Sequence, residues 1–382
     1  MKSTILTSTP PTKGISKYSV ALIEALAETG SIEVVSFKKM YPNALYPGGV
    51  DDDSLRLLRQ SKYIKLRRFL TWYNPLGWMY AGLTIKGKIL HIQWWTYVLA
   101  PVYIVVIIFA KLRGKKVLVT MHNVKPHESG VLKNIANKAI VSLGDEYIVH
   151  TGGGREDLAQ VYGIAVDRIH VIPHGILMPD APLRRISKKQ ARKKLEIAYD
   201  RKVILFFGII RDYKGLDILL NSLAQIKARI PEAHLVIAGK PWGGWDKYDE
   251  IIEKNNLKDN VTLHPEFVAE DDIETYYAAS DLVALPYRHF DAQSGAGTLG
   301  LPFGKAMIVT DTGGLPDLVK NKRAIVRAGD ESELANAIEG ILTNDKLRAE
   351  LEEDSGDLAS AYSWDTIAQQ TIEVYKKLIT KN

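Results

Sequence analysis

The sequence predicts an α/β protein of two domains in which strands and helices alternate. Its 382 residues, 46% hydrophobic and 25% charged, are enough for two sizeable cores. The proline-containing segment MPDAPLRR, from Met178 to Arg185, reads as a linker. On each side of it, short apolar runs precede stretches with apolar residues at helical spacing, which is typical of parallel sheets. We therefore expect one domain over 1–178 and a second over 179–362.

In the first domain we expect a strand over 3–8, a loop TPPTKGI and a helix from about Ser16 to Ala27. Gly14 lies at this strand-to-helix turn, where a residue without a side chain lets backbone amides approach a ligand phosphate. Gly14 is therefore a candidate binding residue. Further strands are predicted over 32–37, 116–121 and 146–150.

The strand over 116–121 delivers His122 at its carboxyl end, where ligand sites of open α/β sheets lie. His127 and Glu128 follow in the segment HNVKPHE and could suggest a metal site. Pro126, however, argues against a helix that would align these ligands, and no further ligand cluster is evident. His122 is thus a candidate site residue, and no metal is expected.

The segment WWTYVLAPVYIVVIIFA, from Trp94 to Ala110, is nearly all apolar and invites a transmembrane interpretation. Its uninterrupted part after Pro101 is too short to cross a bilayer, and the upstream part contains Thr96. The following KKVLVTMHN reads as a core strand. We therefore expect a buried helix here.

The most informative stretch of the second domain is VILFFGIIRDYKGLDILL, over 203–220. A buried strand ends near Gly208, Arg211 and Lys214 follow, and from Gly215 the apolar residues fall at helical spacing. Helix-end amides, the helix dipole and two cations would together favour an anion such as phosphate. The alternative is that both cations are ordinary solvated loop charges.

Further helices and strands are predicted in the second domain and at the end of the sequence. Helices are predicted over 188–195, over IETYYAASDLVALPY (273–287) and from a Ser363 cap onward, with a strand over 234–239. The glycines of TGGGREDLAQVYG fail the GxGxxG spacing at Asp157, so we expect a flexible turn there.

Composition narrows the classes of function. The absence of cysteine excludes disulfides, zinc-thiolate sites and a cysteine nucleophile, and it fits a cytoplasmic protein. The start, MKSTILTSTPPTKG, turns polar too quickly for a signal peptide and reads as a first strand.

Positive charge is concentrated in one stretch, since residues 54–127 contain no Asp or Glu but thirteen Lys and Arg, with four Trp among them. Basic residues interleaved with aromatics indicate an anionic membrane surface or a nucleic-acid groove, and we favour the membrane. Within it, 56–68 has the pattern of an interfacial amphipathic helix. The alternative is that these are ordinary faces of one domain.

The segment FFGIIRDYKGLDILL resembles the donor-phosphate loop of the retaining glycosyltransferases of family four. This resemblance implies the GT-B fold, in which two Rossmann-like domains face each other across a cleft and a C-terminal helix, here 363–382, crosses back to the first domain. In that family an Arg and a Lys bind the diphosphate of a nucleotide sugar, and these positions fall on Arg211 and Lys214. Here Ile209 and Ile210 separate the glycine from the arginine.

Two further segments carry the resemblance. VLVTMHN is similar to the family strand followed by a His that touches the transferred sugar, which implies a catalytic role for His122. DAQSGAGTLG is similar to the two-glutamate signature, whose sugar-contacting carboxylate falls on Asp291 and whose ribose-binding carboxylate falls on Leu299, which cannot accept a hydrogen bond. A QSG variant of this signature offers amides to the diphosphate, and its residues here are Gln293, Ser294 and Gly295.

The resemblance therefore implies a metal-independent retaining glycosyltransferase with no cofactor and a nucleotide-diphosphate sugar as co-substrate. The first domain would bind the acceptor, a lipid-linked or growing glycan in polysaccharide or glycolipid synthesis, and the second the donor. Nucleic acid is not expected as a partner, and the enzyme would be cytoplasmic or peripheral on the cytoplasmic membrane face. Two alternatives remain: a nucleotide-sugar epimerase of the same fold, and a non-catalytic glycan-binding or scaffolding protein, which Leu299 favours.

Overall fold

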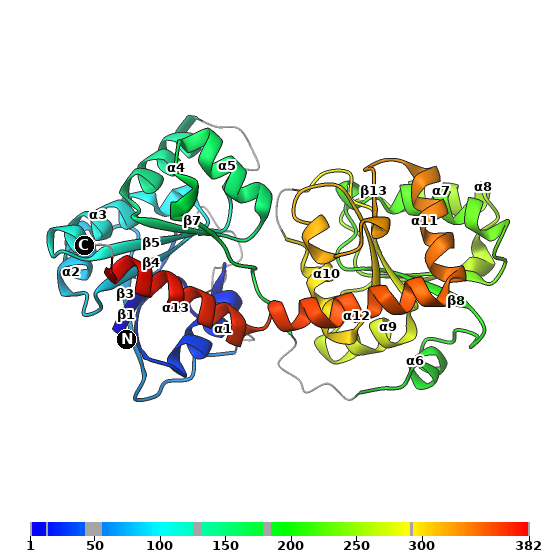
Figure 1. The fold of residues 1–382 in the computed structure, drawn as a ribbon, viewed down its shortest axis with the longest axis horizontal. Coiled ribbons are helices and arrows are strands. Elements are labelled where there is room, and N and C mark those ends of the chain that lie inside the picture. The colour runs from blue at the N-terminus through cyan, green and yellow to red at the C-terminus, as the bar shows by residue number, and fades with distance from the viewer. Residues whose placement is uncertain are drawn as a thin grey trace. The chain divides into compact units, whose positions relative to one another are not determined.

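The computed structural model describes residues 2–12, 14–42, 56–124, 131–178, 185–290 and 293–380. The chain divides into two compact units (Figure 1), Met1–Gly175 with Tyr362–Asn382, and Ile176–Ala361. The sequence-based boundaries at 178 and 362 thus lie within three residues of the observed ones. Each unit is an open parallel sheet with helices on both faces, which confirms the predicted α/β class.

The first unit holds a seven-stranded parallel sheet in the order β3-β2-β1-β4-β5-β6-β7. Its strands are β1 (Lys2–Leu6), β2 (Ser31–Lys39), β3 (Ile64–Thr71), β4 (Ile89–Trp94), β5 (Lys116–Met121), β6 (Glu146–Val149) and β7 (Ile169–Val171). Its helices are α1 (Ser16–Ala27), α2 (Pro75–Thr84), α3 (Ala100–Leu112), α4 (Val131–Leu143), α5 (Gly152–Tyr162) and α13 (Trp364–Thr380).

Two hydrophobic cores, one on each face, hold the first unit together. Helices α1 and α13 pack beside each other on one face, and α2, α3 and α4 cover the other. Helix α13 belongs here because Ile367, Thr371, Tyr375 and Leu378 recur at helical spacing and are all buried. Ser363 caps it as predicted, with its hydroxyl accepting from the backbone N–H of Thr366 at 3.3 Å.

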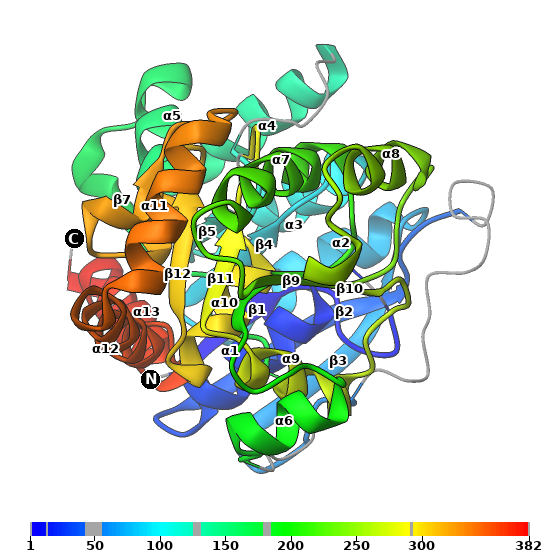
Figure 2. The ribbon, with the colours of Figure 1, turned by 90° about the vertical axis from the view of Figure 1, so that its right-hand side faces the viewer.

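The second unit holds a six-stranded parallel sheet in the order β10-β9-β8-β11-β12-β13. Its strands are β8 (Lys202–Phe207), β9 (Ala233–Ala238), β10 (Val261–His264), β11 (Leu282–Leu285), β12 (Ala306–Thr310) and β13 (Ile325–Val326). Its helices are α6 (Lys188–Lys194), α7 (Leu216–Lys227), α8 (Asp246–Lys254), α9 (Ile273–Ala279), α10 (Gly295–Gly300), α11 (Glu331–Thr343) and α12 (Asp345–Ala361). Figure 2 shows α7 and α8 on one side of this sheet and α6 and α9 on the other.

Three sequence-based expectations were wrong. The helix expected over 273–287 ends at Ala279, because the run LVAL is fully buried between neighbouring strands as β11, and periodicity cannot tell a short buried strand from a buried helix. The amphipathic helix expected over 56–68 is in part strand β3, paired with β2. The glycines expected to form a flexible turn are the first turn of α5, which Thr151 caps.

The long apolar segment is divided between two elements. Its first residue, Trp94, ends β4, and α3 begins at Ala100. Buried residues of α3 include Val102, Tyr103 and Val106. Within the described ranges of the chain, no helix has the length and apolar character that a bilayer crossing requires.

Candidate active site

Each unit has a candidate site at the carboxyl edge of its sheet, near the point where the strand order reverses. In the first unit this switch lies between β1 and β4, and in the second between β8 and β11. The chain leaves such neighbouring strands in opposite directions, which opens a crevice that commonly binds ligands. His122 and Gly14 belong to the first edge, and Arg211 and Lys214 to the second.

Two glycines shape the loop that carries Lys214. Gly208 follows β8 with φ +96°, and Gly215, with φ +69°, directly precedes α7. A Cβ atom on Gly215 would lie 2.0 Å from the carbonyl oxygen of Pro286, so no other residue fits without moving the backbone. The loop is therefore fixed tightly against the end of β11.

Lys214 is a buried cation, with only 8% of its surface exposed. Its ammonium lies 5.6 Å from the centre of the Tyr287 ring and against Gly208, where a Cβ would be 3.1 Å away. Among the described residues no carboxylate pairs with it. Burial first, and then the nearby charge of Arg211, lower the pKa of Lys214 to about 8. A buried ammonium of this kind is stabilised by an anionic ligand.

Arg211 has a different environment from Lys214. Its side chain is exposed, and its guanidinium lies 4.8 Å from the centre of the Trp242 ring. A cavity of about 290 Å³ adjoins this loop and is lined by Ile210, Asp212 and Trp242 among others. Asp212 is paired with Lys247, so this acid does not neutralise Lys214. Arg211 is thus placed to reach a ligand from solvent rather than from within the fold.

The QSG segment lies beside Lys214. Ser294 caps α10 by accepting from the backbone N–H of Gly297 at 3.3 Å, and its hydroxyl is 3.0 Å from that of Tyr287. Tyr287 therefore links Lys214 to Ser294. Gly295 is exposed with open space beside it, which leaves the first amide of α10 accessible.

Gln293 and Leu299 are half-buried, and Leu299 lies within α10. Asp291, predicted to be catalytic, lies outside the described residues.

In the first unit, His122 directly follows β5 and is half-buried. Its Nε2 lies 2.9 Å from Oε1 of Gln93, and its Nδ1 lies 3.2 Å from Nε2 of His150. The Nδ1 of His150 lies 2.9 Å from the carbonyl oxygen of Ile172, which can only accept. His150 therefore carries its proton on Nδ1 when neutral, and its Nε2 accepts from Nδ1 of His122.

Electrostatics keep this cluster uncharged. Burial, and then the neighbouring His150, His174 and His91, hold the pKa of His122 well below its usual value. Burial likewise lowers the pKa of His150 to about 3 and that of His174 to about 4. Because Nδ1 of neutral His122 donates to His150, its Nε2 can accept a hydrogen bond from a sugar hydroxyl when it releases Gln93.

Sequence reasoning missed several members of this cluster. His150 and His174 have ring centres 5.5 and 4.7 Å from that of Tyr18, which itself lies 4.7 Å from His122. His150 directly follows β6, and His174 follows β7 by three residues. The rule that selected His122, a polar residue at the carboxyl end of a strand, would have selected both of these histidines.

Gly14 lies in the loop that joins β1 to α1. Its φ of +93° favours glycine, and a Cβ there would lie 3.5 Å from the Ser8 hydroxyl and 3.6 Å from the Trp95 ring. Helix α1 also carries Tyr18, which contacts His122. Gly14 and His122 are thus brought to the same edge of the first sheet.

Within the described parts of the chain, no group of three or more His, Asp or Glu side chains is arranged to hold a metal ion. His127 and Glu128, which raised the question of a metal site, lie outside those parts.

Comparison with curated proteins finds relatives along part of the chain. It is 26% identical over 250 residues to the D-inositol 3-phosphate glycosyltransferase of Xylanimonas cellulosilytica, a match covering 63% of this chain and 59% of that protein. The protein of the same name from Corynebacterium urealyticum is 26% identical over 265 residues, covering 66% of this chain and 62% of that one. The chain thus matches about 60% of the length of these relatives.

Solved structures match over the whole chain. Anabaena HepE in complex with UDP has a TM-score of 0.71 at 18% identity, covering 99% of this chain and 100% of that one. A glycosyltransferase from Rickettsia africae has a TM-score of 0.71 at 17% identity, with 100% of both chains covered. At such identities the likeness shows the fold, which is GT-B.

Two family models account for most of the sequence. Residues 12–177 match the model described as Glycosyltransferase Family 4, and residues 187–356 match Glycosyl transferases group 1. Together with the two Rossmann-like units, these matches establish that the chain belongs to the GT-B glycosyltransferases of the group 1 and family 4 type.

Proposed function

We propose that the protein is a retaining glycosyltransferase that moves a sugar from a nucleotide-diphosphate sugar to an acceptor hydroxyl. The observation that carries the proposal is the buried ammonium of Lys214, which has no carboxylate partner among the described residues and lies at the carboxyl edge of the second sheet. HepE binds UDP and UDP-glucose, which supports a nucleotide sugar as the donor here.

In this proposal the second unit holds the diphosphate. Lys214 neutralises the charge that builds on the leaving phosphate, and this type of electrostatic stabilisation is usually the largest catalytic contribution. Arg211 approaches the same group from the solvent side. Ser294 and Gly295 present the amino end of α10 to it, next to Tyr287. By their places in the same signature, Gln293 is assigned to the diphosphate together with Ser294 and Gly295, and Asp291 to the sugar of the donor.

The first unit contributes His122 and Gly14. His122 faces the transferred sugar as a neutral imidazole, with Nδ1 held by His150, and its Nε2 bonds a sugar hydroxyl in place of Gln93. Gly14 presents its backbone beside the Ser8 hydroxyl and the Trp95 ring. As the bond from sugar to phosphate breaks, the diphosphate leaves with the bonding electrons and takes up the proton of the attacking hydroxyl.

We further propose a lipid-linked acceptor, reached from an anionic membrane surface. Of the basic residues first considered for this contact, Arg56 pairs with Glu24 at 2.8 Å and Arg67 with Glu33 at 3.1 Å, whereas Arg59, Lys62 and Lys65 are exposed. Helices α2 and α3, which pack side by side, also expose large apolar side chains. These are Leu76, Tyr80, Leu83, Ile108 and Leu112.

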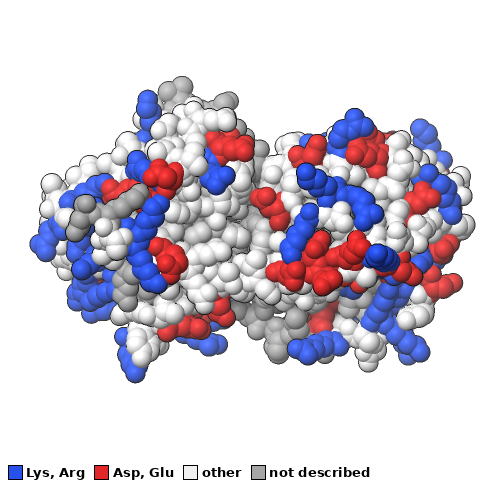
Figure 3. Space-filling model, in the orientation of Figure 1, with Lys and Arg blue, Asp and Glu red and all other residues white. Residues whose placement is uncertain are grey.

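Charge supports the same surface. Lys86 and Lys88 follow α2, and Arg113 and Lys115 follow α3. Figure 3 shows Lys and Arg side chains gathered at the end of the first unit that carries these helices. Exposed apolar side chains flanked by cations are typical of interfacial contact with anionic lipid.

The test is acceptor-dependent release of nucleoside diphosphate. The purified protein is incubated with UDP-sugars and lipid-linked or free glycan acceptors, and the anomeric configuration of the product is read by proton NMR. Retention of configuration supports the proposal, and inversion contradicts it. A free epimer formed without acceptor would identify the epimerase alternative, and nucleotide-sugar binding without release would identify a non-catalytic protein.

A further inference from the structure

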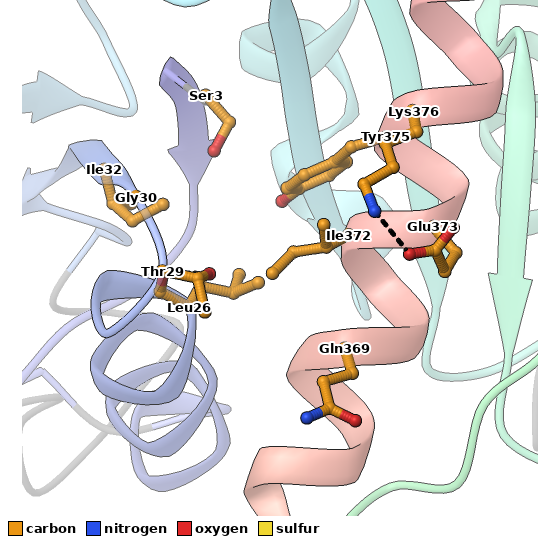
Figure 4. A pocket seen from close by; sticks show the side chains of 10 residues that line it. All are labelled: Ser3, Leu26, Thr29, Gly30, Ile32, Gln369, Ile372, Glu373, Tyr375 and Lys376. Atoms are coloured by element: carbon orange, nitrogen blue, oxygen red, sulfur yellow. Dashed lines mark hydrogen bonds and ion pairs between the residues drawn. The ribbon is translucent and has the colours of Figure 1, made fainter.

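The first unit contains a cavity of about 380 Å³ at the amino-terminal edge of its sheet. It lies between the end of α1, the starts of β1 and β2, and helix α13 (Figure 4). The sheet separates it from His122, which lies at the carboxyl edge. Its volume falls within the roughly 300–1,000 Å³ of small-molecule sites.

Two buried hydroxyls point into this cavity, from Ser3 and Tyr375 (Figure 4). Ser3 is 1% exposed, and its Oγ completes no hydrogen bond with any described residue. A buried hydroxyl without a partner is unfavourable, and a ligand hydroxyl in the cavity would provide the missing hydrogen bond.

The other lining residues define the chemistry of the ligand. Among the described residues that line the cavity, the charged ones are Glu373 and Lys376, which are exposed and paired with each other at 2.7 Å. Leu26 and Ile372 give the cavity an apolar wall, and Gln369 adds an amide at its rim. Two hydroxyls, an apolar wall and no net charge suit a neutral polyol such as a monosaccharide, whose C–H face packs on aliphatic side chains.

A chain of hydrogen bonds leads from the cavity to His122. The Tyr375 hydroxyl lies 2.8 Å from Nδ1 of His91, and Nε2 of His91 lies 3.1 Å from Nε2 of Gln93. Oε1 of Gln93 then lies 2.9 Å from Nε2 of His122. Tyr375, His91 and Gln93 are all at least 98% buried, so water does not replace these bonds.

This series of hydrogen bonds has two proton arrangements, which differ in whether His122 receives a hydrogen bond from Gln93. If Tyr375 donates to the ligand, its oxygen accepts from Nδ1–H of His91 and Gln93 donates to Nε2 of His91. Oε1 of Gln93 then faces the unprotonated Nε2 of His122, so no hydrogen bond joins these two atoms. If Tyr375 donates to His91 instead, His91 carries its proton on Nε2. Gln93 must then turn its amide, and its N–H donates to Nε2 of His122.

We propose that this cavity binds a neutral polyol and that its occupancy sets the hydrogen-bonding state of His122. The coupling to catalysis rests on the role proposed above for His122, whereas the binding site does not. Thr120, whose hydroxyl lies 2.7 Å from Nε2 of His91, can donate or accept and is compatible with both arrangements.

Binding is tested on the full chain with glucose, mannose, galactose and myo-inositol, by ligand-observed NMR with saturation transfer. Gln369 and Gln370 are adjacent exposed residues of α13, and only Gln369 lines the cavity. Gln369→Trp fills the cavity from its rim and should weaken polyol binding at least tenfold. Gln370→Trp is the matched control and should bind as the wild type does. Equal binding by both variants, or no binding of any of these polyols to the wild type, would overturn the proposal.

Coupling is tested on protein labelled with ¹⁵N-histidine, with the His122 resonance assigned by its loss in His122→Gln. Addition of the bound polyol should shift the Nε2 signal of His122 in the wild type. The shift should disappear in Gln369→Trp, which cannot bind, and in Tyr375→Phe, which keeps the ring but lacks the first hydroxyl of the chain. An unchanged His122 signal in the wild type would contradict the coupling. Neither measurement requires transferase activity, so a failure here is separate from a failure of the proposed function.

Discussion

Lys214 and Tyr287 meet where the strand order of the second sheet reverses, with the ammonium 5.6 Å from the centre of the phenol ring. The lysine comes from the loop after β8 and the tyrosine from the end of β11. An aromatic ring stabilises an adjacent ammonium without neutralising it. The charge therefore stays available to an anion, at a cost to the stability of the empty protein.

That cost gives the first prediction, for Lys214→Met. The fall in the pKa of Lys214 from 10.5 to about 8 corresponds to roughly 3 kcal/mol against the charged form. The variant should melt at a higher temperature at neutral pH, and it should bind UDP at least tenfold more weakly because a charge-assisted contact is lost. Calorimetric melting measures the change in stability, and calorimetric titration with UDP measures the change in affinity. Lys254→Met, on the exposed surface, is the control. A variant that binds UDP normally would remove Lys214 from the donor site.

The second prediction concerns pH. Only the ammonium form of Lys214 attracts a diphosphate, and in the empty protein this form is lost as pH rises through about 8. UDP affinity should therefore fall as pH rises above 8, with roughly three quarters of a proton taken up on binding at pH 8.5. Titrations in buffers of different ionisation enthalpy measure this uptake. Lys214→Met should show neither the fall nor the uptake, and a wild type that behaves likewise would refute the assignment.

The third prediction is that His122→Ala lowers the rate of transfer by roughly 10²-fold or more and leaves UDP affinity unchanged, because His122 belongs to the first unit and Lys214 to the second. Kinetics and UDP calorimetry on the same preparation separate the two effects. The control is His170→Ala. It removes a histidine that lies outside the cluster and whose Nε2 is 2.8 Å from Oε2 of Glu146. Equal losses of rate and UDP affinity would place His122 in a different role.

The fourth prediction tests the geometry of the donor loop. Gly215→Ala forces a side chain into φ +69° and against the Pro286 carbonyl, so it should destabilise the protein by more than about 2 kcal/mol. Gly340→Ala, inside α11 with open space around it, should instead stabilise by about 0.5–1 kcal/mol. Denaturant unfolding measures both changes. Similar effects of the two substitutions would mean that the loop has room to relax.

The fifth prediction concerns the membrane surface. Leu76→Ser combined with Leu112→Ser should reduce sedimentation with anionic vesicles, because exposed apolar contacts are lost from both α2 and α3. Arg113→Glu combined with Lys115→Glu should also reduce sedimentation with anionic vesicles, and the reduction should be larger at low salt than at high salt. Val161→Ser, on the exposed side of α5, is the control. Binding that ignores lipid charge and all four substitutions would leave the acceptor to be a free glycan.

Much of the fold could be predicted because its strands are continuous apolar runs and its helices carry clear stripes. The bounds of α1 and β5 were predicted to the residue. The error at β11 has a physical cause, since its four apolar residues follow the helical residues of α9 after only Ser280 and Asp281. Asp281 marks the break, because its carboxylate pairs with Arg192 at 2.7 Å and accepts from the backbone N–H of Val203 at 2.6 Å. Such long-range partners are not visible in a local pattern.

The candidate site likewise contains residues that could be predicted from the sequence and residues that could not. Lys214 and His122 could be selected because each lies beside the end of a strand, a position that sequence alone can locate. Tyr287 could not be selected, because its contact with Lys214 depends on the pairing of β8 with β11. The series of hydrogen bonds from Tyr375 to His122 joins residues 253 positions apart in the sequence through three successive contacts. No rule of sequence spacing predicts such a series.

Helix α13 has a consequence for how the protein is made. The second unit is one continuous segment, Ile176–Ala361, and can complete its core as soon as that segment has left the ribosome. The first unit has all its strands early, but one face of its sheet is covered by α1 without α13 until α13 is translated. During synthesis the part of this face that α13 later covers, which includes β5 with Leu118, is therefore exposed, and it is the natural place for a chaperone to bind.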